Sequence, residues 1–159
     1  VLNGEIYKGS RGIAGELGHF SLYQDGPHCT CGKRGCLEQY ASTSALVRRA
    51  QQITGDNTLT SRAIFALAES GDTVFIKILH EWIVDIAAGI TGLVHIFNPE
   101  MVLIGGGVSA QEELLIQPLR EHVLAGVMPC FAEGLSVERA TLGNDAGMIG
   151  AVKFYLDNQ

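Results

Sequence analysis

Four residues of the types that bind zinc lie close together near the start of the sequence. His19, Cys29, Cys31 and Cys36 bring one imidazole and three thiols into an eighteen-residue segment. Three thiolates and one neutral imidazole fill all four positions of a tetrahedral Zn²⁺ ion and leave none for a catalytic water. We therefore expect a structural zinc site in a loop over residues 19–36, which would shape the chain and not attack a substrate.

A disulfide is the rival use of these cysteines. The three clustered thiols and the distant Cys130 make an awkward set to pair, and a bridge from Cys29 to Cys31 would close a very small ring. We therefore favour the metal, with Cys130 as a small buried hydrophobic residue. His28 stands beside Cys29 and stays open as a competing fourth ligand in place of His19.

Two glycines lie among the ligands, on either side of a basic pair. A chain that folds around an ion needs backbone with positive φ, which only glycine adopts at little cost, and Gly32 and Gly35 can supply it. Lys33 and Arg34 between them would offset part of the negative charge of the thiolates.

The composition is that of an ordinary globular chain. Its 159 residues are 47% hydrophobic, enough for one domain with a real core. The formal net charge is −6 and the basic residues are scattered, so we expect no nucleic acid partner for this domain. The longest stretch without Asp, Glu, Lys or Arg covers the 14 residues 86–99, which is too short to span a bilayer. No stretch has the pattern of a secretory signal, so we expect a reducing, cytoplasmic location, where cysteines favour metal.

The first residues have the pattern of a strand that begins earlier. Asn3-Gly4 between two apolar runs is a strong signal for a hairpin with a two-residue type I′ turn. Val1 and Leu2 would then be the tail of a longer strand, and the sequence has no initiating methionine. We therefore expect a fragment of a larger protein, whose upstream portion contributes to function.

Hydrophobic periodicity and chain-breaking residues predict the elements that position these residues. Strands are expected at 19–23, 101–104 and 135–138, and helices at 37–53, 61–69, 73–97, 109–126 and from 144 onward. Asp72 should cap the longest helix, which Asn98-Pro99 ends. The run 101–104 is wholly apolar, as in a buried strand. This order of elements predicts an α/β fold in which helices cover a mixed sheet.

A run of three glycines, Gly105, Gly106 and Gly107, separates a predicted strand from a predicted helix. Such a turn lets backbone N–H groups and a helix N-terminus approach a nucleotide, because no side chain stands in the way. The run matches neither the P-loop nor the dinucleotide fingerprint. A tight strand-to-helix connection needs glycine in any case, so nucleotide contact and a plain turn stay equally open. Ser109 and Glu112 have the spacing of a capping box that would start the helix.

Three segments carry a resemblance to a known family. The most specific is Gly-Ile-Ala-Gly-Glu-Leu-Gly-His at 12–19, continued by the cysteine segment 29–38 and by Ala41-Ser42. The others are 98–109 and 145–151. With these segments the whole chain resembles the ROK (repressor, open reading frame, kinase) family of bacterial sugar kinases and sugar-responsive repressors.

This resemblance implies a two-domain, actin-like ATPase fold (ribonuclease H-like) that binds sugar and ATP in the cleft between its domains. Residues 1–159 would be the C-terminal, second domain, and the glycine run would face ATP. The resemblance further implies that Glu16 and Glu38 bind sugar hydroxyls, and that His19 both ligates zinc and touches the sugar.

The two glutamates also have plainer interpretations. An ionised carboxylate can accept hydrogen bonds from two adjacent hydroxyls of a sugar ring. On the residues alone, however, Glu16 is a solvated loop residue and Glu38 a carboxylate at the positive end of a helix dipole. The family motif favours the sugar-binding role for both. His80, His95 and His122 are expected on helices without a chemical role.

The implied reaction is ATP-dependent phosphorylation, with Mg²⁺, of a hexose or N-acylhexosamine such as glucose or N-acetylmannosamine. The resemblance places the catalytic Asp and the phosphate-binding loop upstream of Val1, so these 159 residues alone are expected to be inactive. The alternative parent is a ROK repressor that senses sugar in the same pocket and carries a helix-turn-helix further upstream. A standalone zinc-containing sugar-binding module is a third hypothesis. A homodimer is also expected.

Overall fold

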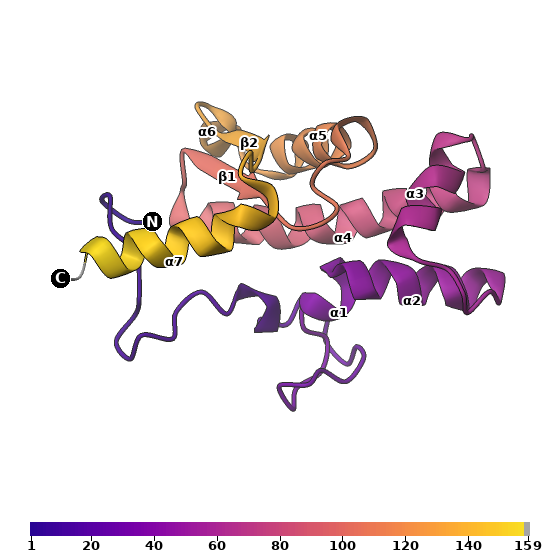
Figure 1. The fold of residues 1–159 in the computed structure, drawn as a ribbon, viewed down its shortest axis with the longest axis horizontal. Coiled ribbons are helices and arrows are strands. Elements are labelled where there is room, and N and C mark those ends of the chain that lie inside the picture. The colour runs from indigo at the N-terminus through magenta and orange to yellow at the C-terminus, as the bar shows by residue number, and fades with distance from the viewer. Residues whose placement is uncertain (158–159) are drawn as a thin grey trace.

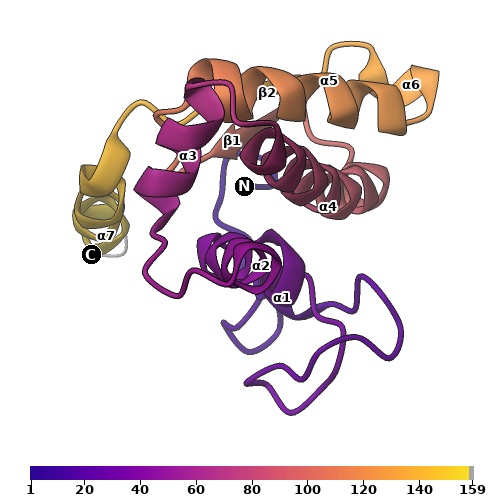
Figure 2. The ribbon, with the colours of Figure 1, turned by 90° about the vertical axis from the view of Figure 1, so that its right-hand side faces the viewer.

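One long helix is the axis on which several of the other helices pack. In the computed structural model, which describes residues 1–157 apart from the side chains of Asn144 and Asp157, α4 (Thr73–Phe97) lies between α2 (Thr43–Thr54) and α5 (Gln117–Gly126) (Figures 1 and 2). The short helix α3 (Ser61–Glu69) also packs on it. These four helices share one apolar core, whose most deeply buried side chains include Leu46, Ile64, Trp82 and Leu119.

The long helix has the bounds that the sequence predicts. The Asp72 carboxylate accepts a hydrogen bond from the backbone N–H of Val74 at 2.9 Å and so caps the helix start. At the other end Asn98 adopts the left-handed conformation, with φ of 43°, and its N–H donates to the carbonyl of Val94. Pro99 follows and cannot continue the helix. The predicted cap and stop are both confirmed.

The single helix expected over 37–53 is wrong, because the chain breaks at Ser42 into α1 (Glu38–Ala41) and α2. Ser42 is extended, and its hydroxyl accepts from the N–H of Ala45 at 3.1 Å, which starts the second helix. Its carbonyl accepts from the buried indole N–H of Trp82, also at 3.1 Å. A local cap and a distant side chain together outweigh the helical periodicity.

The sheet is smaller than expected and is parallel. Among residues 1–157, β1 (Met101–Ile104) pairs only with β2 (Ser136–Arg139), in the register Met101 with Ser136. The α/β class is confirmed, but these residues form no mixed sheet. The expectation of a buried strand at 101–104 is also wrong, because Met101 and Leu103 are exposed on the face that no helix covers.

The N-terminal segment contains the predicted turn but not the predicted second strand. Asn3 and Gly4 both have positive φ, as a type I′ turn requires, and Leu2 and Glu5 exchange two backbone hydrogen bonds. The strand expected at 19–23 is wrong. A 3₁₀ turn, η1 (Leu17–His19), stands at its start, and only one isolated bridge follows, from Ser21 to Cys36. The chain turns here to bring its ligand residues together.

The capping box expected at Ser109 is wrong as well. The buried Ser109 hydroxyl donates to the carbonyl of Gly106 at 2.8 Å and closes the glycine turn, so it caps no helix. The helix begins instead as a π-helical turn, η2 (Glu112–Ile116), which α5 continues.

Cys130 is not the buried hydrophobic residue that the sequence analysis expects. This cysteine lies on the four-residue helix α6 (Pro129–Ala132) and is exposed, because the short helix turns Phe131 inward instead. A 3₁₀ turn, η3 (Gly143–Asp145), then leads into α7 (Ala146–Asp157). The last helix is expected from residue 144 onward, and the side chain of Asn144, which could cap it, lies outside the described part of the chain.

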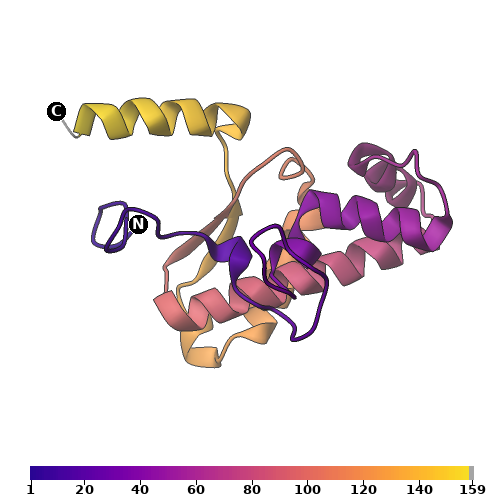
Figure 3. The ribbon, with the colours of Figure 1, turned by 90° about the horizontal axis from the view of Figure 1, so that it is seen from below.

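Helix α7 stands apart from the other helices (Figures 2 and 3). Its exposed apolar side chains include Met148, Ile149, Val152 and Leu156. No helix in the described part of the chain is long and apolar enough to cross a membrane.

Candidate metal centre

The fold brings the four predicted zinc ligands together. The ligand atoms of His19, Cys29, Cys31 and Cys36 all lie within 4.8 Å of one another. Cys31 Sγ is 3.5 Å from Cys36 Sγ, and Cys29 Sγ is 3.5 Å from His19 Nδ1. Zinc bound tetrahedrally by sulfur at about 2.3 Å separates its ligand atoms by about 3.7 Å. The cluster therefore has the chemistry and the spacing to hold one such ion.

Backbone hydrogen bonds close the loop around the cluster. Leu22 N–H donates to the carbonyl of Gly35 at 2.8 Å, and the N–H of Gly35 donates back to Pro27 at 2.9 Å. The N–H of Leu37 then donates to the carbonyl of Phe20 at 2.9 Å. These bonds tie the end of the loop to its beginning just before α1. The ligands therefore come from two passes of chain that the backbone itself holds side by side.

The thiols of the cluster differ in their acidity. A hydrogen bond from the Cys31 backbone, helped by bonds from neighbouring side chains, lowers the pKa of Cys29 to about 6. Desolvation raises the pKa of the fully buried Cys36 to about 12, and its hydrogen bonds to Cys31 and Cys29 act in the same direction. Cys29 therefore loses its proton more readily than Cys36. A cation that binds all three sulfurs must displace the proton of Cys36.

His28 lies outside this cluster. Its Nε2 is 2.6 Å from Nη2 of Arg34, and the two residues also form an isolated backbone bridge. The imidazole of His28 is therefore engaged with a surface arginine, whereas His19 turns Nδ1 toward Cys29. The geometry places His19 at the fourth ligand position and leaves His28 beside the loop.

The two predicted sugar-binding glutamates border the metal cluster. Glu16 Oε2 is 3.8 Å from Nε2 of His19, across the 3₁₀ turn. Glu38, in the first turn of α1, has Oε1 at 3.8 Å from Cys29 Sγ. The two ring nitrogens of His19 therefore face different groups, Nδ1 the thiols and Nε2 the Glu16 carboxylate. Each glutamate therefore lies beside a different member of the cluster, Glu16 beside His19 and Glu38 beside Cys29.

The glycine run does not join this group. Gly105, Gly106 and Gly107 follow β1, and Gly106 has φ of 97°, a conformation that favours glycine. No hydrogen bond or ion pair found within residues 1–157 connects these glycines with the cluster. A Cβ atom added at Gly106 or Gly107 would meet no atom within 4 Å. The backbone at this turn is therefore open to a ligand on its own side of the molecule.

The remaining histidines lie on helices, as expected. His80 of α4 and His122 of α5 stack edge to face, with ring centroids 5.2 Å apart. His95 accepts a hydrogen bond from the N–H of Met128 at 3.2 Å and packs against Phe131. Each of these three histidines contacts a neighbouring helix or loop, and none belongs to the metal cluster.

Sequence reasoning missed the contact that anchors the metal loop. Tyr23 of the loop donates its hydroxyl to Oδ1 of Asp85 at 2.9 Å, and Arg49 of α2 forms a salt bridge with Oδ2 of the same carboxylate. Asp85 is 7% exposed in the middle of α4. Desolvation, followed by the bond to Asp85, raises the pKa of Tyr23. The sequence did contain one signal for this contact. Asp85 is an acidic residue seven positions after Ile78, on the apolar face of the helix.

The glycines of the loop provide a test of its packing. Gly32 and Gly35 both have positive φ, but an added Cβ at Gly35 would lie 1.7 Å from the carbonyl oxygen of Tyr23, whereas one at Gly32 would meet nothing within 4 Å. We expect Gly32→Ala to cost about 1 kcal/mol of folding free energy, from backbone strain alone. Gly35→Ala should cost about 2 to 3 kcal/mol. Urea unfolding measures both, and equal costs would show that the loop packs differently.

Comparison with known proteins shows which fold this chain has and which family it belongs to. The fold matches the crystal structure of a ROK family glucokinase from Streptomyces griseus in complex with glucose and AMPPNP, with a TM-score of 0.84 and 32% sequence identity over 94% of this chain and 54% of that one. The chain thus has the fold of part of a sugar kinase. A sequence model described as the ROK family matches residues 1–158, and the chain belongs to this family.

Relatives within the family fall into two functional kinds. The chain is 38% identical to a glucokinase of Thermotoga maritima, over 95% of its own length and 52% of that protein. It is 28% identical to the xylose repressor of Bacillus subtilis, over 99% of its own length and 41% of that protein. The chain therefore spans about half the length of the curated relatives it matches.

Proposed function

We propose that this chain is the C-terminal, sugar-binding domain of a two-domain ATP-dependent kinase for a hexose or an N-acylhexosamine. The observation that carries the proposal is that Glu16 lies beside His19 and Glu38 beside Cys29, two members of one cluster of metal-binding residues. The S. griseus glucokinase, similar in fold and sequence, binds glucose together with AMPPNP, an analogue of ATP. We extend that pair of ligands to this chain, with Mg²⁺ as the metal that accompanies ATP.

The proposed sugar site uses the two carboxylates as hydrogen-bond acceptors. Adjacent hydroxyls of a pyranose ring can donate to one carboxylate, and charge-assisted bonds of this kind are stronger than neutral ones. Glu38 is held in the first turn of α1, where the helix dipole stabilises its charge. Glu16 and His19 would contact the sugar from the 3₁₀ turn.

The proposed metal is a structural Zn²⁺ held by His19, Cys29, Cys31 and Cys36. With four protein ligands it would cross-link the loop and supply no nucleophile. The backbone of Leu37 alone separates Cys36 from Glu38, so a metal that fixes the cysteine would fix the carboxylate as well. We place the glycine run 105–107 at the ATP, on the strength of its open backbone and the family resemblance.

A sugar-sensing domain of a ROK repressor is the second candidate. The observation that favours it is the similarity to the B. subtilis xylose repressor over 99% of this chain. A sensor needs the same sugar-binding carboxylates but no phosphoryl transfer. The two candidates therefore share the site described here and differ in what the rest of the protein does. A cytoplasmic location suits both.

The decisive experiment is a phosphorylation assay on the natural protein. We expect release of ADP with glucose or N-acetylmannosamine in a panel of sugars, and none from residues 1–159 alone, because half of a cleft cannot position both substrates. Glu38→Gln should raise KM for the sugar about tenfold to a hundredfold, through loss of a charged acceptor. Glu69→Gln, at the exposed end of α3, is the control and should change nothing.

Two results would contradict the proposal, the first its kinase activity and the second the expected inactivity of these 159 residues alone. Sugar binding without ADP release, joined to sugar-dependent release of a DNA operator, would identify the repressor. Turnover by the 159-residue chain alone would show that the catalytic groups lie within it.

A further inference from the structure

One face of α4 contacts the metal loop and α1 through three residues. Trp82, Asp85 and Gly89 follow one another at spacings of three and four residues, which place them on one side of the helix. Trp82 donates to the carbonyl of Ser42, just after α1, and Asp85 accepts from Tyr23 of the metal loop. Gly89 lies against the residue just before α1. The segment that contains the metal ligands and the first turn of α1 therefore rests on this face.

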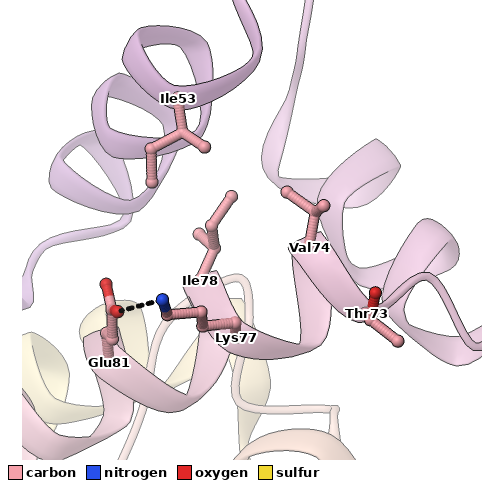
Figure 4. Close-up of a pocket in the computed structure, with 6 residues that line it drawn as sticks. All are labelled: Ile53, Thr73, Val74, Lys77, Ile78 and Glu81. Atoms are coloured by element: carbon pink, nitrogen blue, oxygen red, sulfur yellow. Dashed lines mark ion pairs between the residues drawn. The ribbon is translucent and has the colours of Figure 1, made fainter.

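The first turns of α4 border a different surface, an apolar groove. The groove has a volume of about 570 Å³, and its walls include Ile53 of α2 and Val74 and Ile78 of α4 (Figure 4). None of the residues that line it belongs to the metal loop or to α1. The contacts described above lie further along the helix, from Trp82 to Gly89. The groove and the face that contacts α1 are thus separate parts of one helix.

The missing side chain of the buried Gly89 makes room for Leu37. A Cβ atom added at Gly89 would lie 2.6 Å and 2.8 Å from the two δ carbons of Leu37, and 3.3 Å from its Cγ. Carbon atoms attract one another best at about 3.5 to 4.0 Å, so both δ carbons would clash with the added atom. The end of the leucine side chain thus occupies the space that any larger residue at position 89 would need.

Rotation at the end of the leucine side chain would not relieve this clash. The δ carbons can occupy three staggered positions about the Cβ–Cγ bond, and two of these positions are too close to the added Cβ. With two δ carbons to place, at least one stays in a clashing position. Relief needs Cγ itself to move, either by rotation about Cα–Cβ or by a shift of the backbone. Both movements would break the contact between Leu37 and α4.

Leu37 stands between a metal ligand and a proposed sugar ligand. Cys36 precedes it and Glu38 follows it, so a shift of its backbone would move both neighbours. On the side of the 3₁₀ turn, a Cβ atom added at Gly18 would lie 3.5 Å from Cβ of Glu38, which is an ordinary contact. The first turn of α1 therefore lies directly beside the turn that contains His19, and a shift of Leu37 would alter their spacing.

We propose that Gly89 is a positioning residue, whose lack of a side chain lets Leu37 rest on α4 and so sets the places of Cys36 and Glu38. The part of this proposal that concerns Glu38 rests on the proposed sugar-binding function. Gly89 itself touches neither the metal ligands nor the sugar. It acts through Leu37, one residue from each of the two ligand groups.

Gly89→Ala in the natural protein tests the proposal, with Gly92→Ala as the matched control. Both replace a glycine inside α4, but a Cβ atom added at Gly92 would meet no atom within 4 Å. In calorimetric titrations with glucose and with N-acetylmannosamine, Gly89→Ala should raise the dissociation constant at least about tenfold. Gly92→Ala should leave it within about twofold of the original. Alanine favours helix over glycine, so neither substitution weakens α4 by itself.

Leu37→Ala provides the rescue that separates positioning from a general loss of structure. It removes Cγ and both δ carbons, the three atoms nearest to the added Cβ. In the Leu37→Ala background, Gly89→Ala should change the dissociation constant for the sugar by less than about threefold, because the clash no longer exists. A variant that was merely less stable would be harmed further by the loss of the leucine, not rescued.

Three results would overturn the role of Gly89: sugar affinity unchanged by Gly89→Ala, equal effects of Gly89→Ala and Gly92→Ala, or equal effects of Gly89→Ala with and without Leu37. An unaltered protein that binds neither sugar would instead overturn the proposed function. Competition with a chelator for zinc would then decide the role of Gly89, because Cys36 also adjoins Leu37. Gly89→Ala should raise the dissociation constant for zinc about tenfold, and Gly92→Ala should not. Equal zinc affinities, or no bound zinc, would overturn the proposal.

Discussion

Replacement of Cys31 by serine is expected to remove most of the bound zinc and to weaken sugar binding in the same variant. Cys31 is the exposed member of the cluster, and its Sγ lies 3.5 Å from that of Cys36. A serine hydroxyl is a poor zinc ligand, and three remaining ligands no longer close the tetrahedron. Because Glu38 follows the last ligand by two residues, the carboxylate should lose its fixed position with the metal.

Metal content by mass spectrometry and sugar affinity by calorimetry, both on the natural protein, measure this coupling. We expect the dissociation constant for the sugar to rise by about tenfold to a hundredfold, as when a supporting group of a site is removed. Cys130→Ser is the matched control, since Cys130 is the one cysteine outside the cluster and is exposed. Loss of zinc with unchanged sugar affinity would show that the metal does not orient Glu38.

Asp85→Asn is expected to destabilise the protein by about 3 to 5 kcal/mol, because it leaves a partly buried guanidinium without its counter-charge. The carboxylate of Asp85 is the acceptor for both Arg49 and Tyr23. Nη1 of Arg49 is already buried without a hydrogen-bond partner, so the arginine has no second group to which it can turn. Urea unfolding measures the loss of stability.

Two further variants calibrate this effect. Tyr23→Phe removes one hydrogen bond and should cost about 1 kcal/mol. Glu112→Gln removes an exposed carboxylate 3.7 Å from Arg120, an arginine that still keeps Glu138, and should cost less than about 0.5 kcal/mol. A cost for Asp85→Asn as small as that for Glu112→Gln would mean that water reaches Arg49 and that the buried pair does not anchor the loop.

The features that the sequence predicted well are those with local causes. The bounds of the long helix follow from one capping aspartate and one asparagine-proline stop, both read from neighbouring residues. The hairpin turn follows from Asn3-Gly4, which alone satisfies its two positive φ angles. The grouping of His19, Cys29, Cys31 and Cys36 in space was predictable because thiols and imidazole at short spacing have few other uses.

The features that the sequence did not predict depend on distant partners. The break at Ser42 is completed by Trp82, forty residues later, which donates to its carbonyl. The anchor of Tyr23 on Asp85 joins residues 62 positions apart, and no periodicity connects a loop tyrosine with a helix face. Ser109 has the right spacing for a cap, but burial turned its hydroxyl toward Gly106. Only the packed structure decides between such competing hydrogen bonds.

Because so many helices pack on α4, we expect the helices and the loop of residues 19–36 to unfold separately. The helices that pack on α4 share its core, whereas no residue of 19–36 belongs to that core and the Tyr23–Asp85 bond links this segment to α4. Loss of the metal can therefore melt the loop while every long helix persists. Far-ultraviolet circular dichroism, whose signal comes from the helices, would register such a molecule as native. We therefore expect that preparations of this chain can appear fully folded and yet contain a population in which the loop that holds the proposed sugar ligands is disordered.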